Sequence, residues 1–165
     1  MNFYICSTVR HLLFSLLKAL SESSETHEIL FFSDFQDTSL DAWDLSDLPN
    51  NIHVHEGNRR KFRSHLTRNL RGKIFYFLAM RNFIAPAYLE AAFYDTLREL
   101  HPDIAQPFRN ASPRNLWLFN DRNKMARVFR LINQDFSIIE EGSGNYHYFN
   151  KTWWRWPGRA LLGRP

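Results

Sequence analysis

Cysteine is almost absent from this chain of 165 residues, in which Cys6 is the only one. A single thiol excludes an internal disulfide and a cysteine-rich metal site. A chain without disulfides suits a reducing compartment. At this length the chain corresponds to about one domain, which can bury a hydrophobic core without help from a disulfide or a metal.

Hydrophobic runs long enough to cross a membrane are also missing, because none reaches the roughly 18 to 20 apolar residues that a bilayer requires. Residues 1–20 are apolar, but Arg10, His11 and Lys18 interrupt them. They also lack the basic start, apolar centre and small-residue cleavage site of a signal peptide. We therefore expect a cytoplasmic protein that can associate peripherally with the inner membrane.

Glycine is scarce, with six residues, and none of them builds the G-x-G-x-x-G turn that follows the first strand of dinucleotide-binding domains. The usual dinucleotide site is therefore not expected. Basic residues outnumber acidic ones by 21 to 17, which gives a formal net charge of +4. This balance favours an anionic partner, such as an acidic glycan, an anionic lipid, a sugar nucleotide or nucleic acid.

Apolar runs of strand length alternate with segments of helical periodicity along the chain. The strands are expected at 3–7, 27–35, 52–56, 116–120 and 136–141. The helices are expected at 9–20, at 74–100 with a division at Pro86, and at 122–133 with Asp121 as the cap. The acidic segment 36–51 and the proline-rich segment 101–115 are expected to be loops. This order predicts an α/β fold, in which a parallel, Rossmann-like sheet is flanked by helices.

The last expected strand ends in two acids, in the stretch FSIIEEGSGNYHYF of residues 136–149. Ligands of parallel α/β sheets bind beyond the carboxyl ends of the strands, where Glu140 and Glu141 would stand. Neighbouring acids raise each other's pKa, and a carboxylate tuned in this way can act as general base for a sugar hydroxyl. Gly142 allows a sharp turn there. The alternative is a strand-ending loop whose glutamates are solvated.

The segment IIEEGSGNY resembles the acidic-acidic-glycine motif of bacterial sialyltransferases, notably the lipooligosaccharide sialyltransferases and the capsular polysialyltransferases. The lead-in LWLFNDRNKMARVFRLIN and the opening FYICSTVRHLLFSLLKAL are similar to that family's strand and helix at the same places. The resemblance implies that residues 1–165 are the N-terminal, acceptor-side half of a GT-B glycosyltransferase. This half would bind no cofactor and no catalytic metal. The donor, CMP-sialic acid, would bind in a C-terminal nucleotide-binding domain that the chain lacks.

The resemblance also implies roles for individual residues. The first acid of the family's motif is the general base on the acceptor hydroxyl, a role that would fall on Glu140, with Glu141 and Gly142 shaping the turn. Ser7 and Thr8 follow the first strand, where such folds often touch the acceptor glycan, and are binding candidates by position.

One departure from the family limits the expected activity. The family's second motif is a His-Pro pair downstream of the acidic motif, whereas the only such pair here, at residues 101–102, precedes that motif. The domain alone is therefore expected to be inactive.

The segment NRRKFRSHLTRNLRGK, residues 58–73, holds seven Lys and Arg and no acid. Within the resemblance it would hold an anionic glycan acceptor, and the candidates are Arg59, Arg60, Lys61 and Arg63. The alternative is a non-catalytic α/β module that binds an acidic polymer or an anionic membrane through this segment as a basic helix. A merely solvated face is a third interpretation. Nucleic acid is not the expected partner, because no recognised nucleic-acid-binding motif is present.

Two smaller patterns remain. Residues 148–164, YFNKTWWRWPGRALLGR, combine tryptophans with Lys and Arg, which favours either a membrane interface or packing against a second domain. His53 and His55 would share one face of a strand and could form a metal-ligating pair. No cysteine is nearby and no third ligand is placed with the pair, so no metal site is expected.

Overall fold

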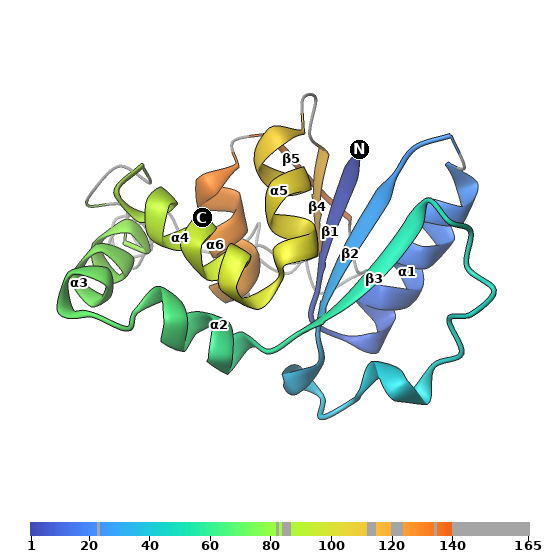
Figure 1. Ribbon diagram of the computed structural model, residues 1–165, viewed down its shortest axis with the longest axis horizontal. Helices are drawn as coiled ribbons and strands as arrows, with labels where there is room; N and C mark the ends of the chain where they lie inside the picture. The colour runs from blue at the N-terminus through green and yellow to red at the C-terminus, as the bar shows by residue number, and fades with distance from the viewer. Residues whose placement is uncertain are drawn as a thin grey trace, which may run out of the picture.

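The computed structural model describes residues 1–22, 24–81, 83, 87–111, 115–119, 124–133 and 135–139. Figure 1 shows a twisted sheet with helices on both of its faces. The strands are β1 (Asn2–Cys6), β2 (His27–Phe32), β3 (Ile52–Gly57), β4 (Asn115–Leu118) and β5 (Phe136–Ile138). The helices are α1 (Val9–Ser21), α2 (Arg59–Leu66), α3 (Leu70–Ala79), α4 (Ala87–Leu100), α5 (Pro102–Asn110) and α6 (Lys124–Ile132).

The five strands form one sheet in the order β3-β2-β1-β4-β5, and all of the pairs are parallel. The strand order reverses direction at β1, whose two neighbours are β2 and β4. All of the carboxyl ends lie on one edge of the sheet, because the strands are parallel. The α/β class and the parallel, Rossmann-like sheet flanked by helices are thereby confirmed.

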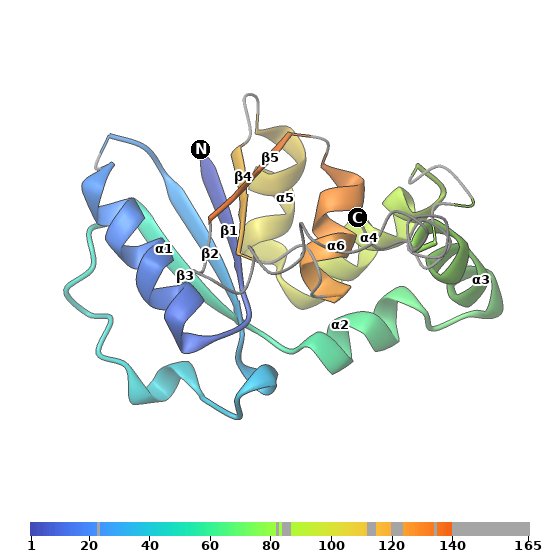
Figure 2. The same ribbon diagram turned by 180° about the vertical axis from the view of Figure 1, so that it is seen from behind.

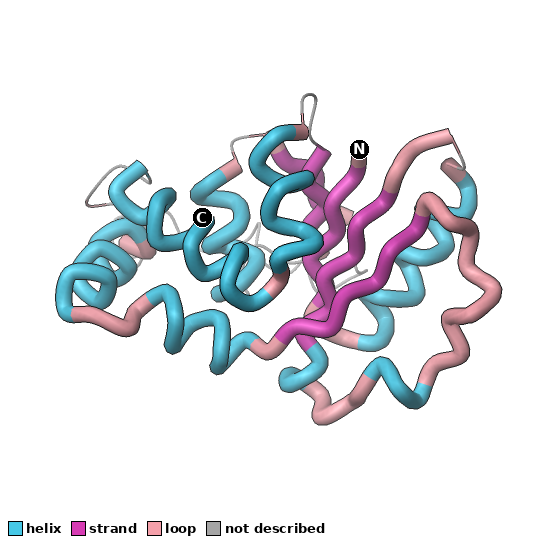
Figure 3. Tube along the Cα trace, in the orientation of Figure 1, coloured by secondary structure: helices cyan, strands magenta, loops and turns pink. Residues whose placement is uncertain are grey.

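The two faces of the sheet have separate hydrophobic cores. Tyr4 and Cys6 of β1 belong to the core beneath α1 and the loop between β2 and β3. Phe3 and Ile5 point the other way, into the larger core beneath the remaining helices. Figures 2 and 3 show α1 alone among the helices on its face, with α4, α5 and α6 opposite. Buried residues on both faces explain why the strands read as continuous apolar runs.

A cluster of phenylalanines fills the larger core. The ring centroid of Phe93 lies 5.0 Å from that of Phe129, 5.8 Å from that of Phe108 and 5.9 Å from that of Phe62. These rings come from α4, α6, α5 and α2 in turn, so one cluster ties four helices together. Edge-to-face contacts of this kind add about 0.5 to 1.5 kcal/mol each beyond the area that is buried.

The prediction that residues 101–115 form a loop is wrong, because α5 occupies residues 102–110 of that segment. Pro102 stands at the first helical position, where the missing N–H has no partner to lose. Pro107 removes one internal hydrogen bond. The burial of Ile104 and Phe108 against the larger core offsets that loss. The number of prolines therefore did not predict whether this segment forms a loop or a helix, whereas the spacing of its apolar residues indicates the helix.

One other expected boundary differs from the structure, and one expected division is found. The strand expected at 27–35 stops at Phe32, and a short 3-10 turn over Ser33–Phe35 follows. The division expected at Pro86 is found, since α3 ends at Ala79 and α4 begins at Ala87. The cap predicted at Asp121 lies outside the described residues.

Replacing Phe93 by alanine should lower the free energy of unfolding by roughly 3 to 5 kcal/mol, because a ring at the centre of the aromatic cluster is lost and a cavity remains. The matched control is Phe77→Ala in α3, whose ring is half exposed and should cost much less. Urea denaturation followed by circular dichroism measures both. Equal losses for the two variants would contradict the assignment of this core.

Candidate functional site

The carboxyl edge of the sheet is where a ligand of this fold would bind. Ser7 and Thr8 follow β1 at this edge, Asp34 follows β2, and Asn58 and Arg59 follow β3. The structure therefore brings the sequence-predicted residues after β1 and those at the start of the basic segment to the same edge. The hydrogen bonds and ion pairs of each residue decide whether its side chain remains available to a ligand.

Thr8 and Ser7 are held by the start of α1. The hydroxyl of Thr8 accepts a hydrogen bond from the backbone N–H of His11 at 3.2 Å, so Thr8 is the N-cap of the helix. The backbone N–H of Ser7 donates to Nδ1 of His11 at 3.2 Å, and Ser7 is buried. The side chain of Gln36 accepts from the backbone N–H of Val9. Both predicted residues thus shape this corner of the edge.

His11 is a buried neutral histidine at the same corner. Its ring stacks on that of Phe119, which follows β4, with 4.6 Å between the centroids and 6° between the planes. Burial, and to a lesser extent the charge of Arg10, lowers the pKa of His11 to about 4. Because Nδ1 accepts from Ser7, the hydrogen of the neutral ring is on Nε2. The stack joins the ends of β1 and β4 at the point where the strand order reverses.

The carboxylate of Asp34, from the turn after β2, lies at the N-terminus of α2. Its carboxylate accepts from the backbone N–H of Arg59 at 2.8 Å and lies 3.3 Å from Nε of the same side chain. It also accepts from the backbone N–H of Arg60, at 3.4 Å. Asn58 caps the helix by accepting from the N–H of Lys61 at 2.9 Å. The carboxylate of Asp34 therefore balances the partial positive charge at the N-terminus of α2, and the guanidinium of Arg59 forms an ion pair with the same carboxylate.

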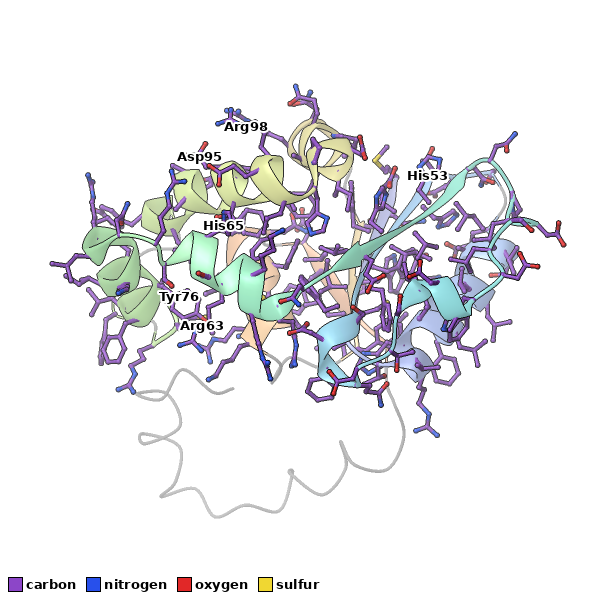
Figure 4. The ribbon with its side chains drawn as sticks, turned by 60° about the horizontal axis from the view of Figure 1, so that its bottom comes forward. His53, Arg63, His65, Tyr76, Asp95 and Arg98 are labelled. Carbon is purple, nitrogen blue, oxygen red and sulfur yellow. The ribbon has the colours of Figure 1, made fainter. Side chains whose placement is uncertain are left out.

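The remaining basic candidates have fewer interactions with the rest of the described protein. Arg60, Lys61 and Arg63 make no ion pair within the described part of the chain. The guanidinium carbon of Arg63 lies 5.7 Å from the ring centre of Tyr76 in α3, and Figure 4 shows the two residues side by side. The basic segment forms two helices, α2 and the start of α3, and not one continuous helix.

Tyr76 of α3, beside Arg63 and away from the carboxyl edge, is an unusual polar group. Its hydroxyl is buried and has no hydrogen-bond partner among the described residues. Burial raises the pKa of Tyr76, while the charges of Arg63 and Arg127 oppose that rise. A buried hydroxyl without a partner costs about 1 to 3 kcal/mol.

A cavity of about 360 Å³ lies between α2, α3 and α4. Glu99 stands at one end of it, 2.9 Å from Nδ1 of His65 and 3.0 Å from the guanidinium of Arg68. Phe75 and Tyr88 stand at the other end, with their ring centres 5.6 Å apart. Arg68 of the basic segment is thereby paired with a carboxylate of α4, and His65 is hydrogen-bonded to the same carboxylate.

The two histidines of β3 are both hydrogen-bonded to one carboxylate, that of Glu28. Nδ1 of His53 and Nε2 of His55 lie 2.9 and 2.8 Å from the two carboxylate oxygens of the buried Glu28. Burial acts to raise the pKa of Glu28, but the hydrogen bonds from His55 and His53 outweigh it and hold that pKa below its ordinary value. In the portion of the chain that the structure describes, no group of three or more His, Cys, Asp or Glu is arranged around a metal ion.

The acidic motif itself, Glu140, Glu141 and Gly142, lies outside the described residues. The chain is described as far as Ile139, whose backbone N–H donates to the carbonyl of Leu118 at 2.7 Å. That bond continues the ladder between β4 and β5 by one residue. No helix among the described residues is long and apolar enough to cross a membrane.

Comparison of the chain with protein-family models, with curated proteins and with solved structures gives no match. The site therefore has to be interpreted from its own geometry. Sequence reasoning missed His11, Asp34 and Tyr76. Asp34 could have been found as the acid at a strand end opposite a basic segment, whereas the burial of Tyr76 depends on how the helices pack.

Lowering the pH from about 6.5 to about 4 should destabilise the protein through His11. The unfolded chain takes up this proton near pH 6.5, whereas the folded chain resists it until about pH 4, so protonation favours unfolding between these values. His11→Gln should therefore show a smaller loss of stability over this range than the original protein. Equilibrium unfolding at several pH values measures this, with pH 8 as the reference. Parallel pH profiles would contradict the assignment.

Proposed function

We propose that this chain is the acceptor-side part of an inverting glycosyltransferase, which moves sialic acid from CMP-sialic acid to a hydroxyl of a glycan. The resemblance of IIEEGSGNY to the sialyltransferase motif supports the chemistry. A parallel α/β sheet is the kind of scaffold on which that chemistry is expected. The donor would bind in a nucleotide-binding domain beyond the residues described above.

The observation that carries this proposal is the position of β5. It pairs in parallel with β4, and the ladder continues through Ile139. Glu140 is the next residue of the chain. A motif that follows this strand starts from the edge on which parallel α/β sheets bind their ligands. Ser7, Thr8 and the start of α2 follow their own strands at the same edge.

In the proposed reaction Glu140 takes the proton of the acceptor hydroxyl. The oxygen attacks the anomeric carbon of sialic acid from the side opposite to the phosphate, and the new carbon–oxygen bond forms as the bond to CMP breaks. CMP leaves with the bonding electron pair, and the configuration at the anomeric carbon is inverted. A general base of this kind contributes roughly 10² to 10⁴ in rate.

The described residues would then orient the acceptor. Arg60, Lys61 and Arg63 are positive and make no ion pair within the described chain, so they can attract an acidic glycan. Arg59 has a different task, because its pairing with Asp34 holds the start of α2 against the end of β2.

Glu140→Gln should lower kcat for sialyl transfer by roughly 10² to 10⁴, because an amide cannot take the acceptor proton. The KM for CMP-sialic acid should change little. Glu141→Gln is the matched control, since it removes one charge from the neighbouring residue and should keep most of the activity. The assay uses the natural gene product with CMP-sialic acid and a glycan acceptor. Full activity of Glu140→Gln, or equal losses in both variants, would contradict the proposed role.

A further inference from the structure

Helix α3 is apolar on its solvent face as well as on its buried face. Tyr76 and Ala79 are buried against the larger core, as expected for a surface helix. On the opposite side Leu70 is 74% exposed, Ile74 48% and Phe77 50%. Their spacing of four and three residues places the three side chains in one stripe. A surface helix in water normally carries polar residues on that side.

Positive charges border this stripe. Arg71 and Lys73 are exposed and stand on either side of the stripe around the helix. Arg81, just beyond the helix, places its guanidinium carbon 4.2 Å from the ring centre of Phe77. None of these three cations makes an ion pair within the described residues. Long basic side chains beside an apolar strip can extend to reach charged groups while their stems stay on apolar surface.

The chain segment that forms α2 and α3 carries no acidic residue, and the carboxylates nearest to it, Asp95 and Glu99, stand on α4 at the cavity between the helices. The sequence has no Asp or Glu between Glu56 and Glu90, a stretch that contains eight Lys and Arg. Both α2 and α3 fall inside it. Figures 1 and 2 show α3 at one end of the molecule, at a distance from the sheet and its carboxyl edge. The stripe can therefore meet a broad surface without covering the candidate site.

We propose that α3 is a membrane-contact helix, which lies along an anionic lipid surface. Leu70, Ile74 and Phe77 would enter the boundary between headgroups and acyl chains, and the bordering cations would contact lipid phosphates. An apolar strip with Lys and Arg at its sides is the pattern of helices that lie in the plane of a bilayer. With ten residues α3 is far too short to span one. The proposal does not depend on the transferase activity.

Charge distinguishes α3 from the second exposed apolar stripe of the molecule. Leu13, Leu17 and Leu20 of α1 are also half exposed. Lys18 of α1 is already bound, because it pairs with Glu22 and lies over the ring of Trp117. Arg10, which makes no ion pair within the described residues, is the one cation left beside the α1 stripe, against three beside the α3 stripe. The α1 stripe thus matches α3 in apolar character but has less free positive charge, which makes it a suitable control.

The test is co-sedimentation of the protein with phosphatidylcholine vesicles that contain roughly a quarter phosphatidylglycerol, a fraction that gives a negative surface. The double variant Ile74→Ser with Phe77→Ser should bind roughly tenfold more weakly or worse, because its apolar stripe is lost. Lys73→Gln should weaken binding about fivefold, and about 1 M salt should abolish that difference. Leu13→Ser with Leu17→Ser in α1 should bind as the original protein does.

Several results would overturn the proposal. These are no binding of the original protein to anionic vesicles, equal binding to pure phosphatidylcholine vesicles, and a loss of binding in the α1 variant only. Two other occupants of the stripe have their own signatures. A dimer that the α3 double variant abolishes in sedimentation velocity would assign the stripe to a second copy. A clear fall in Tm of that variant without vesicles would assign it to a segment of the same chain.

Discussion

The parallel pairing of β1 with both β2 and β4 is the constraint on which the rest of this structure depends. β1 is buried along its whole length, with alternate side chains in two separate cores. Because the pairing on both sides is parallel, β1, β2 and β4 end at one edge, and the order of the strands reverses there. The stack of His11 on Phe119 and the capping of α1 by Thr8 both follow from this arrangement.

The same constraint separates the two surfaces to which we assign functions. The segments after β1, β2 and β3 all start from the carboxyl edge, so Thr8, Asp34 and the start of α2 lie along that edge. α3 is one of the helices that connect β3 to β4, and it lies at one end of the molecule. A membrane contact at α3 and a reaction at the edge are therefore compatible in one chain.

Much of the fold could be predicted from the sequence, because buried parallel strands are short apolar runs and the intervening helices keep their own period. The runs at β1 and β3 and the periodicity of α1 gave boundaries within one residue of those observed. α5 could not be recognised by composition. Its prolines suggested a loop, whereas Pro102 begins the helix and the buried Phe108 holds it against the core. The strand expected to reach residue 35 ended earlier because Asp34 turns toward α2.

The site was less predictable than the fold. Position after a strand was enough to select Ser7, Thr8 and the basic residues at the start of α2. It could not say that the oxygen of Thr8 is used as a helix cap, or that Arg59 is paired with Asp34. The hydroxyl of Tyr76 lacks a hydrogen-bond partner among the described residues because of the way α3 packs beside Arg63. No sequence pattern in residues 70–79 predicts this.

The measurement that tests the central claim most directly is the stereochemistry of transfer. The natural gene product, with its nucleotide-binding domain supplied in the same chain or by a partner, is incubated with CMP-sialic acid and a glycan acceptor, and NMR spectroscopy determines the anomeric configuration of the product. The account predicts a sialylated glycan whose anomeric configuration is opposite to that in CMP-sialic acid. A product with retained configuration, or release of CMP without any sialylated glycan, would contradict it.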